Sequence, residues 1–493
     1  MSLSPNPHAH AVLRALWQAA ELPEAALSRV QLTGGPGEPP VMPSSFAVAT
    51  AAQASLGAAA AAAAELWHLR SGQRQAVQID RAHAALECTA HFSLDGRIPA
   101  LWDKLSGLYA CGGAAGEGGW VRIHANFAHH RDTALQLLGL PPGDATPRSA
   151  VASALQAWSA LDFEQAVAAA GGVAAAARSF AQWDAHPQAH VLAAQPPVRI
   201  TRITPIAPIG AGSPVAAPAK PARWPALSGT QRPLHGLRVL DLTRILAGPV
   251  AARLLAAYGA DVMMVNGPHL PNIEAIADTS RGKLSTLIDL RQAAGRAQLD
   301  ALAGQAQVFL QGYRPGALAA FDFSAEALAS RHPGIVVASL SAYGSAGPWG
   351  GRRGFDSLVQ TATGFNLAEA EAAGTTTPKA MPMQILDYAA GHLLAFGIQA
   401  ALWRQATQGG SWQVEVTLAG VGHWLRSLGR VAGGLATQAP DIAPYLEDSL
   451  CGFGKPGAGR LRAVRHAAVF SATPAGWDRP SMPPGSHPPL WPR

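Results

Sequence analysis

The chain has 493 residues, of which 48% are hydrophobic and 14% charged, so it can bury the cores of several domains and is not intrinsically disordered. Its formal net charge is +6, but the Lys and Arg residues are scattered and form no basic run interleaved with aromatic residues. This distribution argues against a nucleic-acid-binding protein and is compatible with a small anionic partner.

The cysteines provide neither a metal site nor a disulfide framework. Cys88, Cys111 and Cys451 lie far apart in the sequence and lack CxxC spacing. The histidines also lack metal-ligand spacing, so we expect a reduced, cytoplasmic protein without a metal. The apolar stretch 47–64 is mostly alanine, which favours a helix packed against protein over a membrane span.

The first part of the chain is predicted to hold one long helix, short strands and several shorter helices. Residues 47–80 read AVATAAQASLGAAAAAAAELWHLRSGQRQAVQID, an alanine-rich helix followed by a Gly-containing turn and a short alternating strand. GGWVRI at 118–123 is typical of a strand. The pattern that follows predicts helices over 128–138, 149–160 and 163–169.

A proline-rich stretch, residues 203–233, separates the two halves of the chain. Proline recurs there every few residues, which is incompatible with a regular helix or a central strand, so we interpret the stretch as a linker. The expected organisation is, in chain order, an N-terminal region 1–106, a small α/β domain 107–202, the linker 203–233, a large α/β domain 234–429 and an irregular Pro/Gly-rich tail 430–493.

Strands and helices alternate after the linker. Short apolar strands are predicted over 238–242, 261–265, 287–290, 308–310 and 335–340. Helices are predicted over 249–258, 292–302 and 325–331. This alternation predicts a Rossmann-like, mostly parallel sheet covered by helices on both faces. The turn after the first strand, LTRILAGPV, has a single glycine and therefore lacks the GxGxxG fingerprint of nicotinamide binding.

An internal repeat links the two halves. Residues 383–417 read MQILDYAAGHLLAFGIQAALWRQATQGGSWQVEVT, which is again a long helix ending in Leu-Trp, a Gly-containing turn and an alternating strand. Aligning the two Leu-Trp pairs places Ala51 opposite Asp387, the only carboxylate of the second helix. The first helix therefore has no counterpart of this carboxylate.

Five segments of the second half resemble, in order, motifs of the class III CoA-transferases, also called the CaiB/BaiF family. They are LHGLRVLDLTRILAGPVAARLLAAYGADVMMVN (234–266), RGKLSTLIDL (281–290), FLQGYRPGAL (309–318), IVVASLSAYGSAGPWGGRRGFDSLVQTATG (335–364) and MPMQILDYAAGHLLAFGIQAALW (381–403). Each segment alone is weak evidence, but five in the family's order are specific. The last one resembles the helix that carries the family's nucleophilic aspartate, which implies Asp387.

The resemblance implies an enzyme that moves CoA from an acyl-CoA donor to a carboxylic-acid acceptor. The expected intermediates are a mixed anhydride and a CoA thioester on Asp387. CoA is then a substrate, and no permanently bound cofactor is expected. The residues expected to contact CoA are Ala247, Gly248, Pro249, Arg281, Lys283, Tyr313, Arg314 and Gly344. Asn266 stands where the family has an acidic residue, and Gly312-Tyr313 replaces Asn-Phe.

Several alternatives remain open from the residues themselves. Asp387 is also suited to be the N-cap of its helix, and Asp356 to cap a turn. A 2-methylacyl-CoA racemase-like enzyme is one alternative activity, but it needs a His–Asp pair, and residues 341–356 contain no histidine. A non-catalytic acyl-CoA-binding subunit is another.

The N-terminal half resembles a different part of the same family. Residues 107–198 resemble its smaller domain, which normally follows the nucleophile-bearing helix. The chain therefore resembles a degenerate, truncated copy, with the Ala51 helix within residues 1–106, fused ahead of a more complete copy. Since family members form interlocked dimers with active sites between large and small domains, the resemblance implies a homodimer or a pseudo-dimer within one chain. The expected partners are acyl-CoA and small carboxylic acids, without nucleic acid or membrane.

Overall fold

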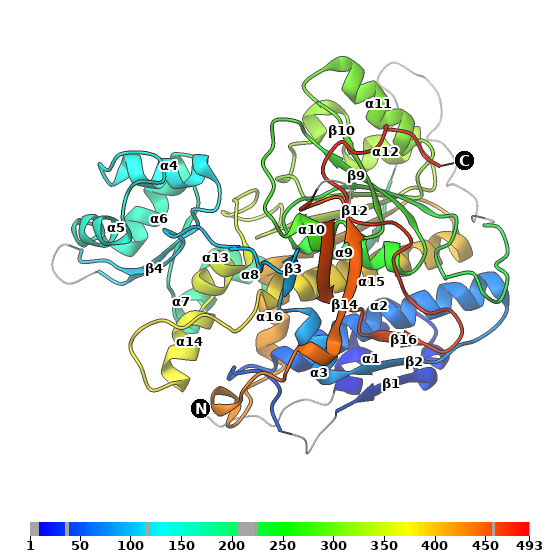
Figure 1. Ribbon diagram of the computed structural model, residues 1–493, viewed down its shortest axis with the longest axis horizontal. Helices are drawn as coiled ribbons and strands as arrows, with labels where there is room; N and C mark the ends of the chain where they lie inside the picture. Colours follow the sequence, from blue (N-terminus) through cyan, green and yellow to red (C-terminus); the bar gives the residue numbers. More distant parts are fainter. Residues whose placement is uncertain are drawn as a thin grey trace.

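The computed structural model describes residues 9–34, 39–113, 118–204, 222, 224–455 and 459–492 (Figure 1). Its central element is a seven-stranded sheet in the order β10-β9-β8-β11-β12-β13-β7. The strands are β7 (Arg199–Arg202), β8 (Arg238–Leu242), β9 (Asp261–Asn266), β10 (Lys283–Leu287), β11 (Val308–Gln311), β12 (Val336–Ser341) and β13 (Trp412–Thr417). All neighbours pair in parallel except β7, which runs antiparallel to β13 at one edge. The expected Rossmann-like, mostly parallel sheet is confirmed.

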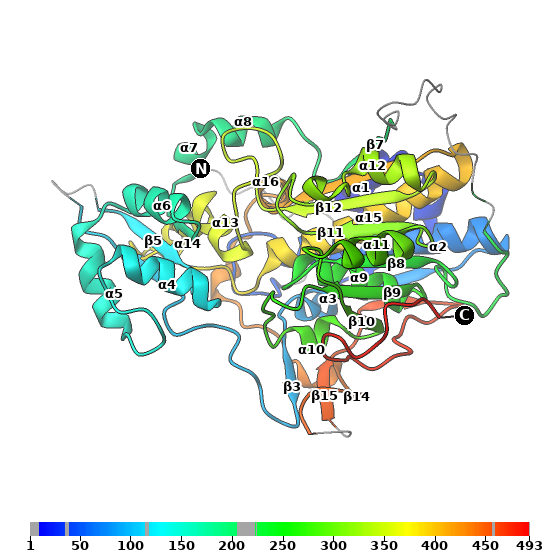
Figure 2. The same cartoon turned by 90° about the horizontal axis from the view of Figure 1, so that it is seen from above.

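Helices cover both faces of this sheet (Figure 2). They are α9 (Ala247–Ala257) and α15 (Ile385–Gln408) on one face, and α11 (Ala293–Ala303) and α12 (Ala325–Arg331) on the other. Successive strand residues point to opposite sides, so Val239 and Val336 pack in the core with α9 and α15. Their neighbours Leu240 and Val337 pack in the core with α11 and α12. Burial on both faces explains why these strands are apolar without alternation.

The N-terminal part packs against α15. It comprises α1 (Ala9–Ala19), η1 (Glu24–Arg29), β1 (Val30–Thr33), α2 (Val48–Ser71), β2 (Val77–Asp80) and α3 (Arg81–Glu87). Helix α2 lies along α15 (Figure 1). The alanines between Ala51 and Ala63 are at most 2% exposed, since their small side chains let the two helices approach closely. This alanine-rich stretch is therefore packed against protein, as the sequence predicts.

Residues 107–176 form a small lobe at one end of the molecule (Figure 1, cyan). Its antiparallel sheet has the order β4-β5-β6, with β4 (Gly107–Ala110), β5 (Trp120–Ile123) and β6 (Ala174–Ala176). Its helices are α4 (Ala128–Leu137), α5 (Arg148–Ala154), η3 (Leu155–Ala157) and α6 (Ala160–Ala169). The lobe has its own apolar core around Val121, Leu155 and Phe163. Two helices, α7 (Phe180–Asp184) and α8 (Pro187–Ala193), connect the lobe to β7.

The C-terminal tail corrects the expectation of an irregular segment. Its strands β14 (Leu446–Cys451) and β15 (Gly459–Val464) form an antiparallel sheet with β3 (Phe92–Leu94). A third strand, β16 (Ala468–Phe470), pairs antiparallel with β2, which itself pairs in parallel with β1. Strands β15 and β16 escape prediction because they pair with β3 and β2, which lie near the start of the chain.

Two further boundaries differ from the prediction. The strand expected at 287–290 is β10, four residues earlier, because Lys283 enters the sheet paired with buried Asp241. The helix expected at 149–160 ends at Ala154, and a 3-10 turn follows it. Most of the predicted linker, residues 205–221 and 223, lies outside the described residues.

The remaining helices complete the described fold. They are α10 (Ile276–Thr279), η4 (Ala319–Phe321), α13 (Asp356–Ala362), α14 (Phe365–Ala372), α16 (Leu418–Ser427), η5 (Gly434–Ala436) and η6 (Ala443–Tyr445). In the described part of the chain, α15 alone is long and apolar enough to cross a membrane, with a mean hydropathy of 1.3, but this window is 100% buried inside the protein. No described cluster of three or more His, Cys, Asp or Glu side chains could hold a metal.

Candidate active site

Asp387 lies in the first turn of α15, at the wall of a cavity of about 440 Å³. The loop after β8, the loop after β11 and the segment before α13 line the same cavity. These loops meet there because the carboxyl ends of parallel strands share one edge of the sheet. The side chain of Asp387 is partly buried, whereas its neighbours Leu386 and Tyr388 are fully buried. The helix thus directs a single carboxyl group toward the cavity.

Asp387 is not the N-cap of its helix. The capping position is Gln384, whose side chain makes no capping hydrogen bond. Instead, the backbone N–H of Asp387 donates to Oδ2 of Asp356 at 2.9 Å, so a carboxylate from α13 satisfies the start of α15. No described residue donates a hydrogen bond to the carboxyl group of Asp387. This group is therefore available to a ligand.

The two aspartates affect each other electrostatically. Burial raises the pKa of Asp387 well above its usual range, and the negative charge of Asp356 raises it further. Burial also raises the pKa of Asp356, to about 6, against the opposing effect of the N–H groups of α15, the amide of Gln360 and the guanidinium of Arg122. The two carboxyl groups therefore titrate as a coupled pair, and burial makes both of them harder to ionise than an exposed aspartate.

The small lobe contributes one wall of the cavity. Phe127, His129 and His130, at the start of α4, line it together with Asp387. Phe355, which precedes α13, stacks on His124 of the lobe with a ring separation of 3.9 Å. The site is thus built by elements from both halves of the chain.

Four arginines line this cavity: Arg244, Arg314, Arg352 and Arg353. The Arg244 guanidinium donates to the carbonyl of Pro271, and the Arg353 guanidinium donates to that of Gly171 at 2.6 Å. Arg352 lies 3.4 Å from Glu164. Arg314 is exposed and forms no ion pair with a described residue. Such a cluster can bind the phosphates of an anionic ligand.

Of these arginines, the sequence pointed only to Arg314. Arg244 lies in LTRILAGP and the adjacent pair Arg352-Arg353 in GRRGFD, two stretches within the segments that resemble family motifs. The position of these three arginines in those segments was the signal that could have identified them as site residues. Their convergence depends on the tertiary fold.

The other expected CoA contacts divide into three groups. Ala247, Tyr313 and Arg314 line the cavity of Asp387. Gly344 lines an adjoining cavity of about 320 Å³, which shares Tyr313 and Arg314 with the first. Gly248 lies against Thr243, where an added Cβ would approach to 2.4 Å. The carbonyl of Pro249, one residue further, accepts a hydrogen bond from Lys283 at 2.9 Å.

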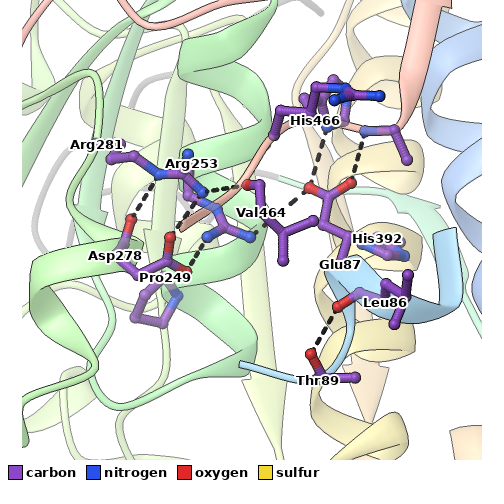
Figure 3. A network of polar contacts seen from close by, with 12 residues as sticks. Leu86, Glu87, Thr89, Pro249, Arg253, Asp278, Arg281, His392, Val464 and His466 are labelled. Atoms are coloured by element: carbon purple, nitrogen blue, oxygen red, sulfur yellow. Dashed lines mark hydrogen bonds and ion pairs between the residues drawn. The ribbon is translucent and has the colours of Figure 1, made fainter. Parts of the chain in front are cut away.

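Arg281 and Lys283, which were expected to contact CoA phosphates, are engaged within the fold. Lys283 is fully buried, and its Nζ lies 2.9 Å from Oδ2 of Asp241. Arg281 is also buried, pairs with Asp278 at 2.6 Å and donates to the carbonyl of Val464 (Figure 3). Both charges are therefore used to join parts of the fold, and neither residue lines a described cavity.

One residue of the cavity wall has a strained backbone. Ile245, in the loop after β8, has φ of 77°, in the left-handed region. A β-branched side chain is unfavourable there, by about 1–3 kcal/mol. The flanking strand and helix must therefore hold this loop in shape.

Known proteins are similar to the second half of the chain. The family model described as CoA-transferase family III matches residues 234–438. The chain is 34% identical over 205 residues to "Probable fatty acyl-CoA transferase Rv3272" of Mycobacterium tuberculosis, covering 39% of this chain and 52% of that protein. It is 30% identical over 242 residues to "Succinate--glutarate CoA-transferase" of Agrobacterium fabrum, covering 43% and 60%.

Solved structures of similar proteins align with only part of the chain. The structure of Rv3272 from M. tuberculosis aligns at 34% identity with a TM-score of 0.35, covering 40% of this chain and 58% of that one. A CAIB/BAIF family protein from Brucella suis aligns at 25% identity with a TM-score of 0.36, covering 46% and 65%. The chain spans about half the length of the relatives it matches. Residues 234–438 of this chain are thus similar to CoA-transferase family III.

Proposed function

We propose that this chain is a CoA-transferase that moves CoA from an acyl-CoA to a carboxylic acid, with Asp387 as the nucleophile. The observation that carries the proposal is the carboxyl group of Asp387, which is not used as a helix cap and lines a cavity together with four arginines. The relatives named above are described as transferring CoA, and this supports the reaction class. Acyl-CoA and small carboxylic acids are the proposed substrates.

The first half-reaction consumes the acyl-CoA. A carboxylate oxygen of Asp387 attacks the thioester carbonyl, the C–S bond breaks, and CoA leaves as a thiolate. The resulting mixed anhydride is attacked by this thiolate at the carbonyl of Asp387. The donor acid then departs as a carboxylate, and an aspartyl-CoA thioester remains.

The second half-reaction reverses these steps with the acceptor. Its carboxylate attacks the aspartyl thioester, and the released thiolate then attacks the acceptor's carbonyl. The new acyl-CoA and free Asp387 are formed. Water must be kept from both intermediates, and the buried neighbours Leu386 and Tyr388 support this requirement.

Asp356 is proposed to position the nucleophile. It accepts the N–H of Asp387 and is itself held by Gln360. Its negative charge opposes ionisation of Asp387. Because Asp387 attacks only as the carboxylate, its raised pKa lowers the fraction of the protein that is ready to react at a given pH.

CoA is proposed to lie along the two adjoining cavities. Arg244, Arg314, Arg352 and Arg353 would contact its phosphates, and Ala247 and Tyr313 its pantetheine arm. Gly344 lies in the second cavity, where a further part of the ligand would extend. CoA is a substrate in this scheme, and a resident cofactor is not part of it.

The pseudo-dimer is also a proposal. Helices α2 and α15 each have 24 residues, pack against each other, and are each followed by a strand and a helix. The small lobe follows the Ala51 helix in the chain yet lines the cavity of Asp387. Both facts support a degenerate copy fused ahead of a second one. A cytoplasmic location is proposed with it, supported by the three free, buried cysteines.

Trapping the covalent intermediate tests the proposed function. The purified protein is incubated with a panel of acyl-CoA donors, quenched with hydroxylamine and analysed by intact and peptide mass. A donor-dependent aspartyl hydroxamate at Asp387, absent from Asp387→Asn, is the expected result. If the wild type binds CoA but gives no adduct with any donor, the proposal is wrong. Exchange of the C2 proton in deuterated water would then indicate the racemase-like alternative, for which His129 and His130 supply histidines beside Asp387.

A further inference from the structure

His130 is a buried imidazole that lines the cavity of Asp387 from the other half of the chain. It lies in the first turn of α4 and is 5% exposed. Its Nδ1 is occluded and has no hydrogen-bond partner, while its Nε2 is not occluded and makes no hydrogen bond to a described residue. A buried polar atom without a partner is rare in proteins and calls for an explanation, such as a catalytic role of the ring that carries it.

Aromatic neighbours fix the orientation of this ring. Phe127 lies edge-on to it at 5.7 Å and 88°, and Phe355 at 6.0 Å and 66°. The ring of His129 lies 4.0 Å away, tilted by 56°. The imidazole is therefore held in place before any substrate arrives, and a donor fixed in this way needs little reorganisation when charge develops.

The ring is neutral at physiological pH. Burial lowers the pKa of His130 to about 3, and the nearby His129, Arg353 and Arg244 lower it further. A neutral imidazole carries one proton. With Nδ1 occluded and unpaired, a proton on Nε2 is the arrangement that offers an N–H to the cavity.

We propose that His130 donates a hydrogen bond from Nε2 to the acyl oxygen of the bound thioester and to the oxyanion formed when Asp387 attacks. This inference rests on the proposed function. In that step, the C=O π electrons move onto oxygen as the Asp387–carbonyl bond forms, and they return as CoA thiolate leaves. His130 retains its proton throughout. The small lobe thereby supplies a group that acts on the substrate, and not only a cover for the site.

His124 provides a matched control. It is 4% exposed, has an occluded and unpartnered Nδ1, and contacts Phe355, as His130 does. It does not line the cavity. A structural contribution common to both histidines would therefore be lost in either variant, whereas a contact with substrate would be lost only at His130.

The test compares His130→Phe, His130→Gln and His124→Gln in single-turnover labelling of Asp387 by the acyl-CoA that labels the wild type. CoA affinity and thermal unfolding are measured in parallel. His130→Phe is expected to slow labelling about 10²–10³-fold, the usual effect of removing one oxyanion donor, with CoA affinity changed less than about threefold. His130→Gln should recover part of the rate because its amide N–H can replace Nε2–H. His124→Gln should label at the wild-type rate.

Each other outcome overturns the proposal. If His130→Phe labels at the wild-type rate, His130 does not donate to the substrate. If His124→Gln loses as much labelling rate as His130→Phe, the effect is structural. If His130→Phe does not fold, His130→Gln is compared with His130→Asn, whose amide lies near Nδ1. Equal or reversed rates would contradict the assignment to Nε2. An unlabelled wild type rejects the proposed function and this inference together, while a labelled wild type with an unaffected His130→Phe rejects only the inference.

Discussion

The two 24-residue helices α2 and α15 pack side by side but begin in very different surroundings. The start of α15 faces a cavity through Asp387 and is capped from outside by Asp356. The segment before α2 is closed by Glu369, which accepts hydrogen bonds from the backbone N–H of Ser45 and from the hydroxyl groups of Ser44 and Ser45. Ala51 is fully buried there. The same helix design therefore serves as a structural element in one place and carries the candidate nucleophile in the other.

The strongest test of this difference removes the carboxylate of α15. Asp387→Ala should lower the rate of CoA transfer on the order of 10⁴-fold or more, because the covalent route is lost. Thermal unfolding should change little, since no described residue hydrogen-bonds this carboxyl group. Steady-state turnover measures the first effect and calorimetry the second. Loss of activity together with unfolding would instead indicate a structural role.

Placing a carboxylate in α2 should not transfer the function. Ala51→Asp would put a charge at a fully buried position with no prepared partner, which costs about 3–5 kcal/mol. Denaturant unfolding measures this cost. Combined with Asp387→Ala, the substitution should not restore turnover, because Ala51 lines none of the described cavities. Recovery of activity in the double variant would show that α2 has access to substrate.

Replacing Lys283, the buried lysine of β10, tests whether this residue stabilises the fold or binds CoA. Lys283→Met should destabilise the protein by about 3–5 kcal/mol, because Asp241 is left buried without its partner. CoA affinity, measured by calorimetry on the folded fraction, should stay within about threefold of wild type. A selective loss of CoA binding with unchanged stability would restore Lys283 as a ligand contact.

Glycines in the two helices should respond differently to alanine. A Cβ at Gly391 of α15 would lie 2.6 Å from the carbonyl oxygen of Ala247, so Gly391→Ala should cost about 1–3 kcal/mol. At Gly57 of α2, the nearest atom is a flexible methyl of Leu32 at 3.3 Å. The gain in helix propensity from alanine offsets that contact, and Gly57→Ala should stay within about 0.5 kcal/mol of wild type. Unfolding curves of both variants compare the packing directly.

The pH dependence of CoA transfer through Asp387 should reveal the electrostatic effect of Asp356. The negative charge of Asp356 raises the pKa of Asp387, so Asp356→Asn should lower that pKa. Since only ionised Asp387 attacks, the acid limb of the pH–rate profile should move to lower pH in the variant. Loss of the charged cap should cost about 1 kcal/mol of stability. An acid limb that stays in place would show that the two carboxyl groups do not interact.

Local sequence patterns predicted the elements that are buried on both sides. The apolar runs of β8, β9 and β12 and helix α12 were located within one or two residues. Strand β10 was misplaced because Lys283 reads as a surface residue until Asp241 is known to face it. The tail strands were missed because β16 needs β2, far away in sequence, to form.

Residues of the candidate site could be predicted only where they lie in a recognisable sequence motif. Asp387, Ala247, Tyr313 and Arg314 lie in segments that resemble family motifs, and all four line the cavity. The cap by Asp356 and the wall containing His130 depend on contacts between elements that are 31 and more than 200 residues apart. No local pattern specifies such contacts. They follow from the packing of α13 against both α15 and the sheet of the small lobe.

Oxygen transfer into Asp387 tests the central claim most directly. The protein is turned over with its acyl-CoA donor and an acceptor acid labelled with ¹⁸O in its carboxylate, and the peptide containing Asp387 is then analysed by mass spectrometry. Attack of the acceptor on an aspartyl thioester leaves one acceptor oxygen on Asp387, so the label should accumulate there with turnover. Turnover that leaves the Asp387 peptide unlabelled would contradict the covalent route and the role assigned to α15.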